Sequence, residues 1–159
     1  MKKLIFLISL FVLGLPVSAF AWEATVSFVN DADTFIVKDA EGKKQKIRLY
    51  GVDAPELEQP LGDVAYEYLN SILLNQAVRI ESLYYDPYKR IVARVWLNDA
   101  EISELLVKQG YAWVFKHFCV ADMCSDWEQL QNEAKQEQLG VWQDAKSIPP
   151  WKWRKQQGK

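Results

Sequence analysis

The sequence predicts an α+β fold, a five-stranded β-barrel of the OB type with three helices. Strand-like segments separated by turn residues begin soon after residue 21, and one apolar stripe at helical spacing interrupts them. Two more strand-like segments follow this stripe, and helical spacing then returns. Five strands with a helix between the third and the fourth is the order expected of an OB-fold.

The expected strands are short and lie around turns rich in Asp, Gly and Pro. Asp39-Ala40-Glu41-Gly42 separates the second strand from the third, and Asp86-Pro87-Tyr88-Lys89 separates the fourth from the fifth. The five strands are expected at residues 24–29, 34–38, 46–52, 78–84 and 91–97.

Three helices are predicted from apolar residues at helical spacing. The first begins at Gly62 and the second, which contains Ile102, ends near Gly110. Ser125 or Asp126 is the expected cap of the third helix, and Gly140 is its expected stop. The stripe of the first helix consists of Val64, Ala65, Tyr68, Leu69, Ile72 and Leu73.

Residues 1–21 have the features of a secretory signal. Two lysines precede an apolar run from Leu4 to Leu15, and small residues stand before the expected cleavage after Ala21. A membrane-spanning helix needs roughly 20 apolar residues, and this run is shorter and ends at Pro16. We therefore expect export to the periplasm or the medium, with no stable membrane association after cleavage.

The mature chain is expected to form one monomeric domain over residues 22–143, followed by a basic, tryptophan-containing tail over 144–159. The tail either packs back on the barrel after Pro149-Pro150 or serves as an electrostatic arm for a phosphate backbone. The whole chain has 19 basic and 21 acidic residues. Because nucleic-acid-binding domains usually have a basic surface, any such function must depend on a local site.

The chain has two cysteines, Cys119 and Cys124. In an exported protein a disulfide between them is the expected state. Two alternatives remain open, a metal site with His117 and Asp122 and a pair of free thiols.

Three segments contain polar residues that a barrel does not need for its own stability. They are Asn30-Asp31-Ala32-Asp33-Thr34, the run from Arg48 to Glu56, and Asp86-Pro87-Tyr88-Lys89-Arg90. Each by itself could be a turn, a loop or a solvated surface.

Together, these segments resemble the thermonuclease family, whose type member is staphylococcal nuclease. The family pattern Val-x-Asp-Gly-Asp-Thr corresponds to Val29–Thr34, with Ala32 in place of glycine. The pattern Arg-Leu-x-Gly-(Ile/Val)-Asp-(Thr/Ala)-Pro-Glu corresponds to residues 48–56, and Asp-x-Tyr-x-Arg to residues 86–90. Further matches at residues 106–112 and 140–142 extend the resemblance to nearly the whole mature chain.

The resemblance implies a Ca²⁺-dependent endonuclease that hydrolyses phosphodiester bonds of DNA and/or RNA and leaves 3′-phosphate ends. It implies that the carboxylates of Asp33 and Asp53 and the carbonyl of Ala54 hold the ion, and hard oxygen ligands suit Ca²⁺.

The resemblance also assigns the reacting groups. Glu56 takes a proton from the attacking water, and Arg48 and Arg90 grip the phosphoryl oxygens. Tyr88 and Phe118 are the expected substrate-binding side chains.

The sequence departs from the family pattern at three places. Ala32 would be strained if its backbone needed a positive φ, and the loop between Glu56 and Gly62 is short. Lys116 and Phe118 stand where the type enzyme has two tyrosines near the nucleotide.

Two other functions remain open. A thermonuclease-like domain without catalysis would only hold nucleic acid. An exported OB module would bind oligosaccharide or peptide through Trp113, Phe115 and Phe118.

Overall fold

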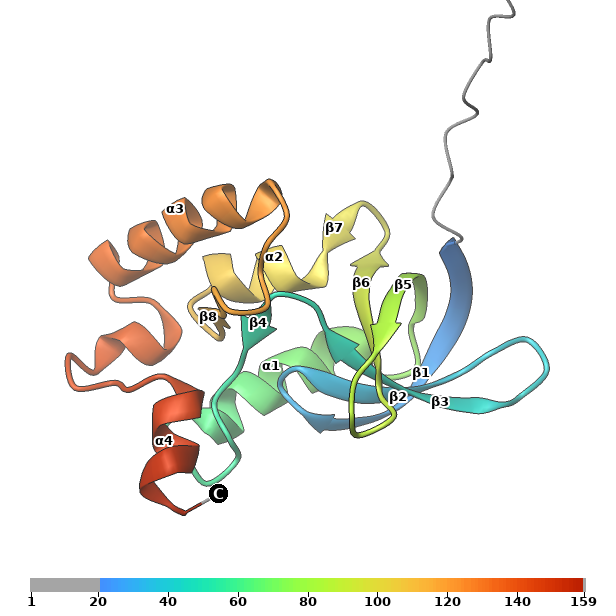
Figure 1. The fold of residues 1–159 in the computed structure, drawn as a ribbon, viewed down its shortest axis with the longest axis horizontal. Coiled ribbons are helices and arrows are strands. Elements are labelled where there is room, and N and C mark those ends of the chain that lie inside the picture. The colour runs from blue at the N-terminus through green and yellow to red at the C-terminus, as the bar shows by residue number, and fades with distance from the viewer. Residues whose placement is uncertain (1–20, 159) are drawn as a thin grey trace, which may run out of the picture.

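A computed structural model describes residues 21–158 of the protein (Figure 1). Six of its strands form one sheet in the order β3-β2-β1-β5-β6-β7, and a parallel pairing of β3 with β6 closes five of them into a barrel. The barrel strands are β1 (Ala21–Asp31), β2 (Thr34–Lys38), β3 (Lys44–Leu49), β5 (Ala77–Tyr85) and β6 (Ile91–Leu97). The predicted α+β fold class with an OB-type barrel is therefore confirmed.

The short strands lie at the margins of the barrel. β7 (Ala100–Glu101) extends the sheet beyond β6, while β4 (Val52–Asp53) pairs with β8 (Trp113–Val114) in a separate two-stranded ladder. The sequence predicted one strand over 46–52, but the structure ends β3 at Leu49. The reason is Gly51, whose φ of 73° interrupts the extended backbone before β4.

Within residues 21–158 the structure has four α-helices, one more than predicted, and none is long and apolar enough to cross a bilayer. The additional helix is α4, which lies in the segment predicted as a tail. The helices are α1 (Gly62–Leu73), α2 (Ile102–Lys108), α3 (Met123–Gln136) and α4 (Pro150–Gln156), with a 3-10 turn η1 (Gly140–Gln143) before α4.

The predicted ends of the third helix are wrong. α3 begins at Met123 with Asp122 at the N-cap position, so Ser125 and Asp126 lie inside the first turn, where the hydroxyl of Ser125 donates to the carbonyl of Asp122. The helix stops at Gln136, and Gly140 opens the 3-10 turn that follows.

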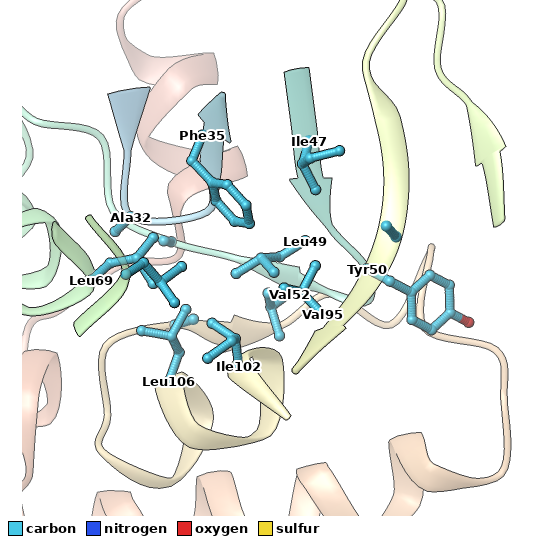
Figure 2. Close-up of a cluster of buried hydrophobic side chains, with 14 of the residues drawn as sticks. Ala32, Phe35, Ile47, Leu49, Tyr50, Val52, Leu69, Val95, Ile102 and Leu106 are labelled. Carbon is cyan, nitrogen blue, oxygen red and sulfur yellow. The ribbon is translucent and has the colours of Figure 1, made fainter. Parts of the chain in front are cut away.

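The core fills the barrel and the space between the barrel and helices α1 and α2. Figure 2 shows Phe35 from β2 and Ile47 and Leu49 from β3 pointing toward Leu69 of α1 and Leu106 of α2. All five are almost completely buried. Burial of such a side chain contributes about 1.5–3 kcal/mol relative to exposure. Because side chains alternate along a strand, this packing turns Arg48 to the other face of β3.

Gly51 is fixed under a disulfide between Cys119 and Cys124. A Cβ at position 51 would lie 2.7 Å from the sulfur of Cys119 and 2.9 Å from the ring of Trp127, so only glycine fits there. The turn between β3 and β4 is thereby held by the segment that leads into α3. This turn determines where Arg48 and Asp53 lie relative to each other.

The C-terminal segment packs back on the molecule. The indole of Trp151 stacks on the ring of Phe115, with centroids 4.8 Å apart and planes 2° apart. The side chain of Gln59 donates to the carbonyl of Ile148 over 2.7 Å. Residues 144–158 are thus structured, as the packing alternative for the tail required. The segment predicted as a signal, 1–21, lies outside the described residues except for Ala21, the first residue of β1.

Candidate functional site

The three polar segments meet at one cleft of about 760 Å³. It lies beside the turns that follow β1, β3 and β5, with α4 at one wall. The cleft is lined by every residue that the sequence assigned to metal, catalysis or substrate: Asp33, Arg48, Asp53, Ala54, Glu56, Tyr88, Arg90 and Phe118.

Strand pairing brings these residues together. Thr34 of β2 is opposite Arg48 of β3, and Arg48 is opposite Val92 of β6 in the parallel pairing that closes the barrel. The first polar segment therefore lies on one side of β3, which carries the start of the second segment. The third segment, which precedes β6, lies on the other side of β3. The β3–β4 turn then carries Asp53 back toward Asp33.

Asp33 and Asp53 form the buried floor of the cleft, with 6% and 2% of their surface exposed. Arg48 lies between them, its Nη2 atom 3.0 Å from Asp33 Oδ2 and 3.1 Å from Asp53 Oδ1. The backbone N–H of Ala54 donates to Asp33 Oδ2 over 2.8 Å, and the hydroxyl of Thr34 donates to Asp33 Oδ1 over 3.0 Å. Both carboxylates are thus oriented by neighbouring donors.

Asp31 adds a carboxylate to which sequence reasoning gave no role. Its Oδ1 accepts from the backbone N–H of Asp33, and it lines the same cleft. Burial and the neighbouring charge of Asp33 raise the pKa of Asp31 from 3.8 to about 7. The same two causes raise the pKa of Asp53 to about 6, although Arg154 and Arg48 oppose the shift. Negative charge is therefore crowded where water solvates it poorly.

These shifts predict how stability depends on pH when calcium is chelated. The native state keeps protons on Asp31 and Asp53 that the unfolded chain releases near pH 3.8. The native state therefore binds more protons, and the free energy of unfolding falls as pH rises from about 4 to 7. We expect a melting temperature roughly 10–15 °C lower at pH 8 than at pH 5 in buffer stripped of calcium. Asp31→Asn should reduce this difference.

Thermal unfolding followed by circular dichroism checks that expectation. Asp99→Asn is the matched control, since Asp99 is an exposed carboxylate outside the cleft. Equal pH dependence in Asp31→Asn, Asp99→Asn and the unsubstituted protein would contradict it.

Arg90 is held at the other side of the cleft by its own hairpin. Asp86 Oδ1 accepts from the backbone N–H groups of Tyr88 and Arg90, while Arg90 Nε donates to Asp86 Oδ2 over 2.7 Å. Burial alone would raise the pKa of Asp86, but the hydrogen bonds from Arg90 lower it. The guanidinium also lies 5.4 Å from the ring of Tyr88. The Asp-x-Tyr-x-Arg spacing therefore fixes the arginine by a local turn.

Glu56 lies in a short loop that is tied at several points. The backbone N–H of Gln59 donates to the carbonyl of Glu56, and the backbone N–H of Gly62 donates to the carbonyl of Gln59. A Cβ on Gly62 would overlap the Glu56 carbonyl oxygen, which explains glycine at the start of α1. The loop is thus closed by hydrogen bonds despite its shortness.

Arg154 is the residue that sequence reasoning missed most clearly. It comes from α4, yet its Nη2 lies 2.8 Å from Asp53 Oδ2 and its Nη1 lies 2.7 Å from Glu56 Oε1. The only sequence signal was its place among the basic residues of the predicted tail, which gives no hint of these partners. For Asp31 a signal existed, since it precedes Asp33 by two positions in one turn.

The structure shows how Ala32 and Phe118, which depart from the family pattern, are accommodated. Ala32 is not among the residues with positive φ, so alanine causes no left-handed strain there. Tyr88 and Phe118 reach the cleft with 79% and 48% of their surface exposed, and Tyr85 joins them at 70%. His117 is exposed and packs edge-on against Phe118, outside the cleft.

The residues of the cleft fit a calcium ion. Within the described part of the chain no group of three or more His, Cys, Asp or Glu side chains is gathered for a metal. The proposed ligands are instead two carboxylates and the carbonyl of Ala54, hard oxygen donors of the kind that Ca²⁺ takes with water. Burial, and after it the neighbouring charge of Asp33, raises the pKa of Asp31 and of Asp53, and a cation bound beside them would favour their charged forms.

The fold and the cleft define an OB-type barrel protein with a site of buried carboxylates and arginines. The chain belongs to the staphylococcal nuclease family, because the family profile described as "Staphylococcal nuclease homologue" matches residues 46–144.

Named relatives agree with this assignment. An Escherichia coli protein described as "Uncharacterized endonuclease" is 34% identical over 97% of this chain and 98% of its own length. A Haemophilus influenzae protein with the same description is 31% identical over 81% of this chain and 71% of its own length. The Arabidopsis thaliana "Staphylococcal-like nuclease CAN1" is 30% identical over 82% of this chain, but only 37% of that relative is covered.

Proposed function

We propose that this protein is an exported, Ca²⁺-dependent endonuclease that hydrolyses phosphodiester bonds of DNA and/or RNA and leaves 3′-phosphate ends. The observation that carries the proposal is the meeting of Asp33, Asp53, Glu56, Arg48 and Arg90 at one cleft. These residues come from three separate segments. A barrel needs none of them for its core.

The carboxylates of Asp33 and Asp53 and the carbonyl of Ala54 would hold the calcium ion. When bound, the ion offsets the negative charge that builds up on the phosphate during the reaction. The hydrogen bonds from Ala54 N–H and Thr34 hydroxyl orient Asp33 for this role.

Glu56 is the proposed general base. Its carboxylate takes a proton from a water molecule as the water oxygen bonds to phosphorus. The P–O5′ bond breaks, the phosphate stays on the 3′ oxygen, and the departing 5′ oxygen takes a proton from solvent. Arg48 and Arg90 would donate hydrogen bonds to the phosphoryl oxygens, which become more crowded and more charged in the transition state.

Exposed aromatic rings support binding of the nucleotide next to the reacting phosphate. Tyr85, Tyr88 and Phe118 line the cleft with much of their surface exposed. Stacking of a base on such a ring is worth about 1–3 kcal/mol and does not depend strongly on the base. These contacts suit DNA or RNA without sequence preference.

Export is proposed from the sequence of residues 1–21, which has the pattern of a secretory signal. The disulfide between Cys119 and Cys124 is consistent with an oxidising compartment.

Plasmid and RNA digestion with and without calcium tests the proposal. EGTA is expected to abolish cleavage and added Ca²⁺ to restore it, because cleavage depends on the cation at Asp33 and Asp53. Retention of full activity in EGTA would reject the calcium requirement. Binding without cleavage in Ca²⁺ would favour a domain that only holds nucleic acid.

The chemistry of the product ends has its own readout. A 3′-phosphate blocks extension by a DNA polymerase, so fragments should be extended only after phosphatase treatment. Extension without phosphatase would reject the proposed bond cleavage while leaving nuclease activity intact.

A further inference from the structure

Arg154 is fixed against the cleft by the packing of the whole C-terminal segment. Stacking of Trp151 on Phe115 holds the first turn of α4. The hydrogen bond from Gln59 to the carbonyl of Ile148 ties the approach to α4 to the loop that contains Glu56. Gln59 itself is 4% exposed, so this contact is part of the folded interior.

The guanidinium of Arg154 donates hydrogen bonds to both carboxylate oxygens of Asp53. Nη2 lies 2.8 Å from Oδ2, Nη1 lies 3.3 Å from Oδ1, and Nη1 also lies 2.7 Å from Glu56 Oε1. Arg154 thus binds one proposed calcium ligand and the proposed base at the same time.

A calcium ion at Asp53 and a guanidinium at Asp53 would draw on the same two oxygens. The ion carries two positive charges and the guanidinium carries one, so they repel each other at the short distance that a shared carboxylate imposes. Arg48 contacts one oxygen of each proposed ligand, Oδ2 of Asp33 and Oδ1 of Asp53, so Arg154 is the arginine that engages both oxygens of Asp53.

We propose that Arg154 competes with the divalent cation for Asp53 and thereby sets the cation affinity of the site. The inference rests on the proposed function, because it takes Asp53 as a calcium ligand. Arg154 is a positioning residue in this arrangement. It holds Asp53 and Glu56 in place while paired with them and leaves them when the cation binds.

Competition at one residue couples the cation to the helix that carries Arg154. If docking of α4 weakens cation binding, cation binding must weaken docking of α4 by the same factor. Where calcium is scarce, Arg154 keeps Glu56 engaged as well, and the base is not free to take a proton. The enzyme would then be restrained until it reaches calcium-rich surroundings.

Calcium titration by calorimetry on the mature chain tests the competition. Arg154→Met removes the charge and keeps a side chain of similar length, and we expect its Kd for Ca²⁺ to be on the order of tenfold lower than that of the unsubstituted protein. Arg154→Lys keeps the charge but loses the forked donors that reach Asp53 and Glu56, so its Kd should lie between those of Arg154→Met and the unsubstituted protein. Lys155→Met is the matched control, since it removes a charge from the same helix at an exposed position and should change Kd little.

The reciprocal effect is measured by amide hydrogen exchange. Saturating Ca²⁺ should speed exchange in residues 150–156 of the unsubstituted protein and of Arg154→Lys. In Arg154→Met, Ca²⁺ should leave the exchange of this segment unchanged, whether α4 is docked or loosened in that variant.

The outcomes separate the inference from the proposed function. Calcium binding by the unsubstituted protein with an equal or higher Kd in Arg154→Met would overturn the inference alone, as would slower exchange of α4 in Ca²⁺. Absence of calcium binding in all four proteins would reject the proposed calcium site and the inference with it.

Discussion

Glu56→Gln is expected to lower kcat by about 10²–10⁴-fold, the usual contribution of a general base. Glutamine has the shape of glutamate and its amide oxygen can still accept from Arg154, but it cannot take a proton from water at neutral pH. Because Glu56 is not in the core and its loop is held by backbone and Gln59 contacts, the melting temperature should stay close to that of the unsubstituted protein. Initial rates of digestion at saturating Ca²⁺ give the measurement.

Glu58→Gln is the matched control for that substitution. Glu58 lies in the same loop, is exposed and does not line the cleft, so its loss should leave kcat unchanged. Turnover near that of the unsubstituted protein in Glu56→Gln would remove Glu56 from the mechanism.

Arg90→Lys is expected to lower kcat/KM by about 10²–10³-fold, similar to the loss of one donor that stabilises a transition-state oxyanion. Arg90 Nε donates to Asp86, and Nη1 donates to the hydroxyl of Thr34. The remaining N–H groups of the guanidinium can donate to the phosphoryl oxygens. Lysine keeps the charge but has no fork of donors, so it cannot hold Asp86 and a phosphate in the same geometry.

Arg79→Lys tests whether any such loss is specific to the cleft. Arg79 lies over the ring of Trp96 at 4.0 Å and does not line the site. A similar kcat/KM in both variants would show that bidentate donation by Arg90 is not needed for the reaction.

The barrel and the order of its elements were predictable because they depend on short-range patterns. The strands at residues 34–38 and 91–97 have the predicted bounds, and α1 begins at the predicted Gly62. Part of the site was predictable for the same reason, because Asp86 and Arg90 interact within one hairpin. Assignment of roles to Asp33, Asp53 and Glu56 depended on the resemblance to a known family, because each residue by itself could be an ordinary turn residue.

Only the tertiary structure showed that the C-terminal segment forms a helix and packs against the barrel. A seven-residue helix that begins at a proline has little stability by itself, and α4 is held by the stacking of Trp151 on Phe115. The pairing of Arg154 with Asp53 joins residues 101 positions apart, which no local pattern indicates. The pKa values of Asp31 and Asp53 were equally hidden, because they depend on burial and on neighbouring charges that exist only after folding. The sequence by itself determined which polar residues lie at the turns of the barrel. Long-range packing determined that Arg154 from α4 joins Arg48 as a partner of the Asp53 carboxylate.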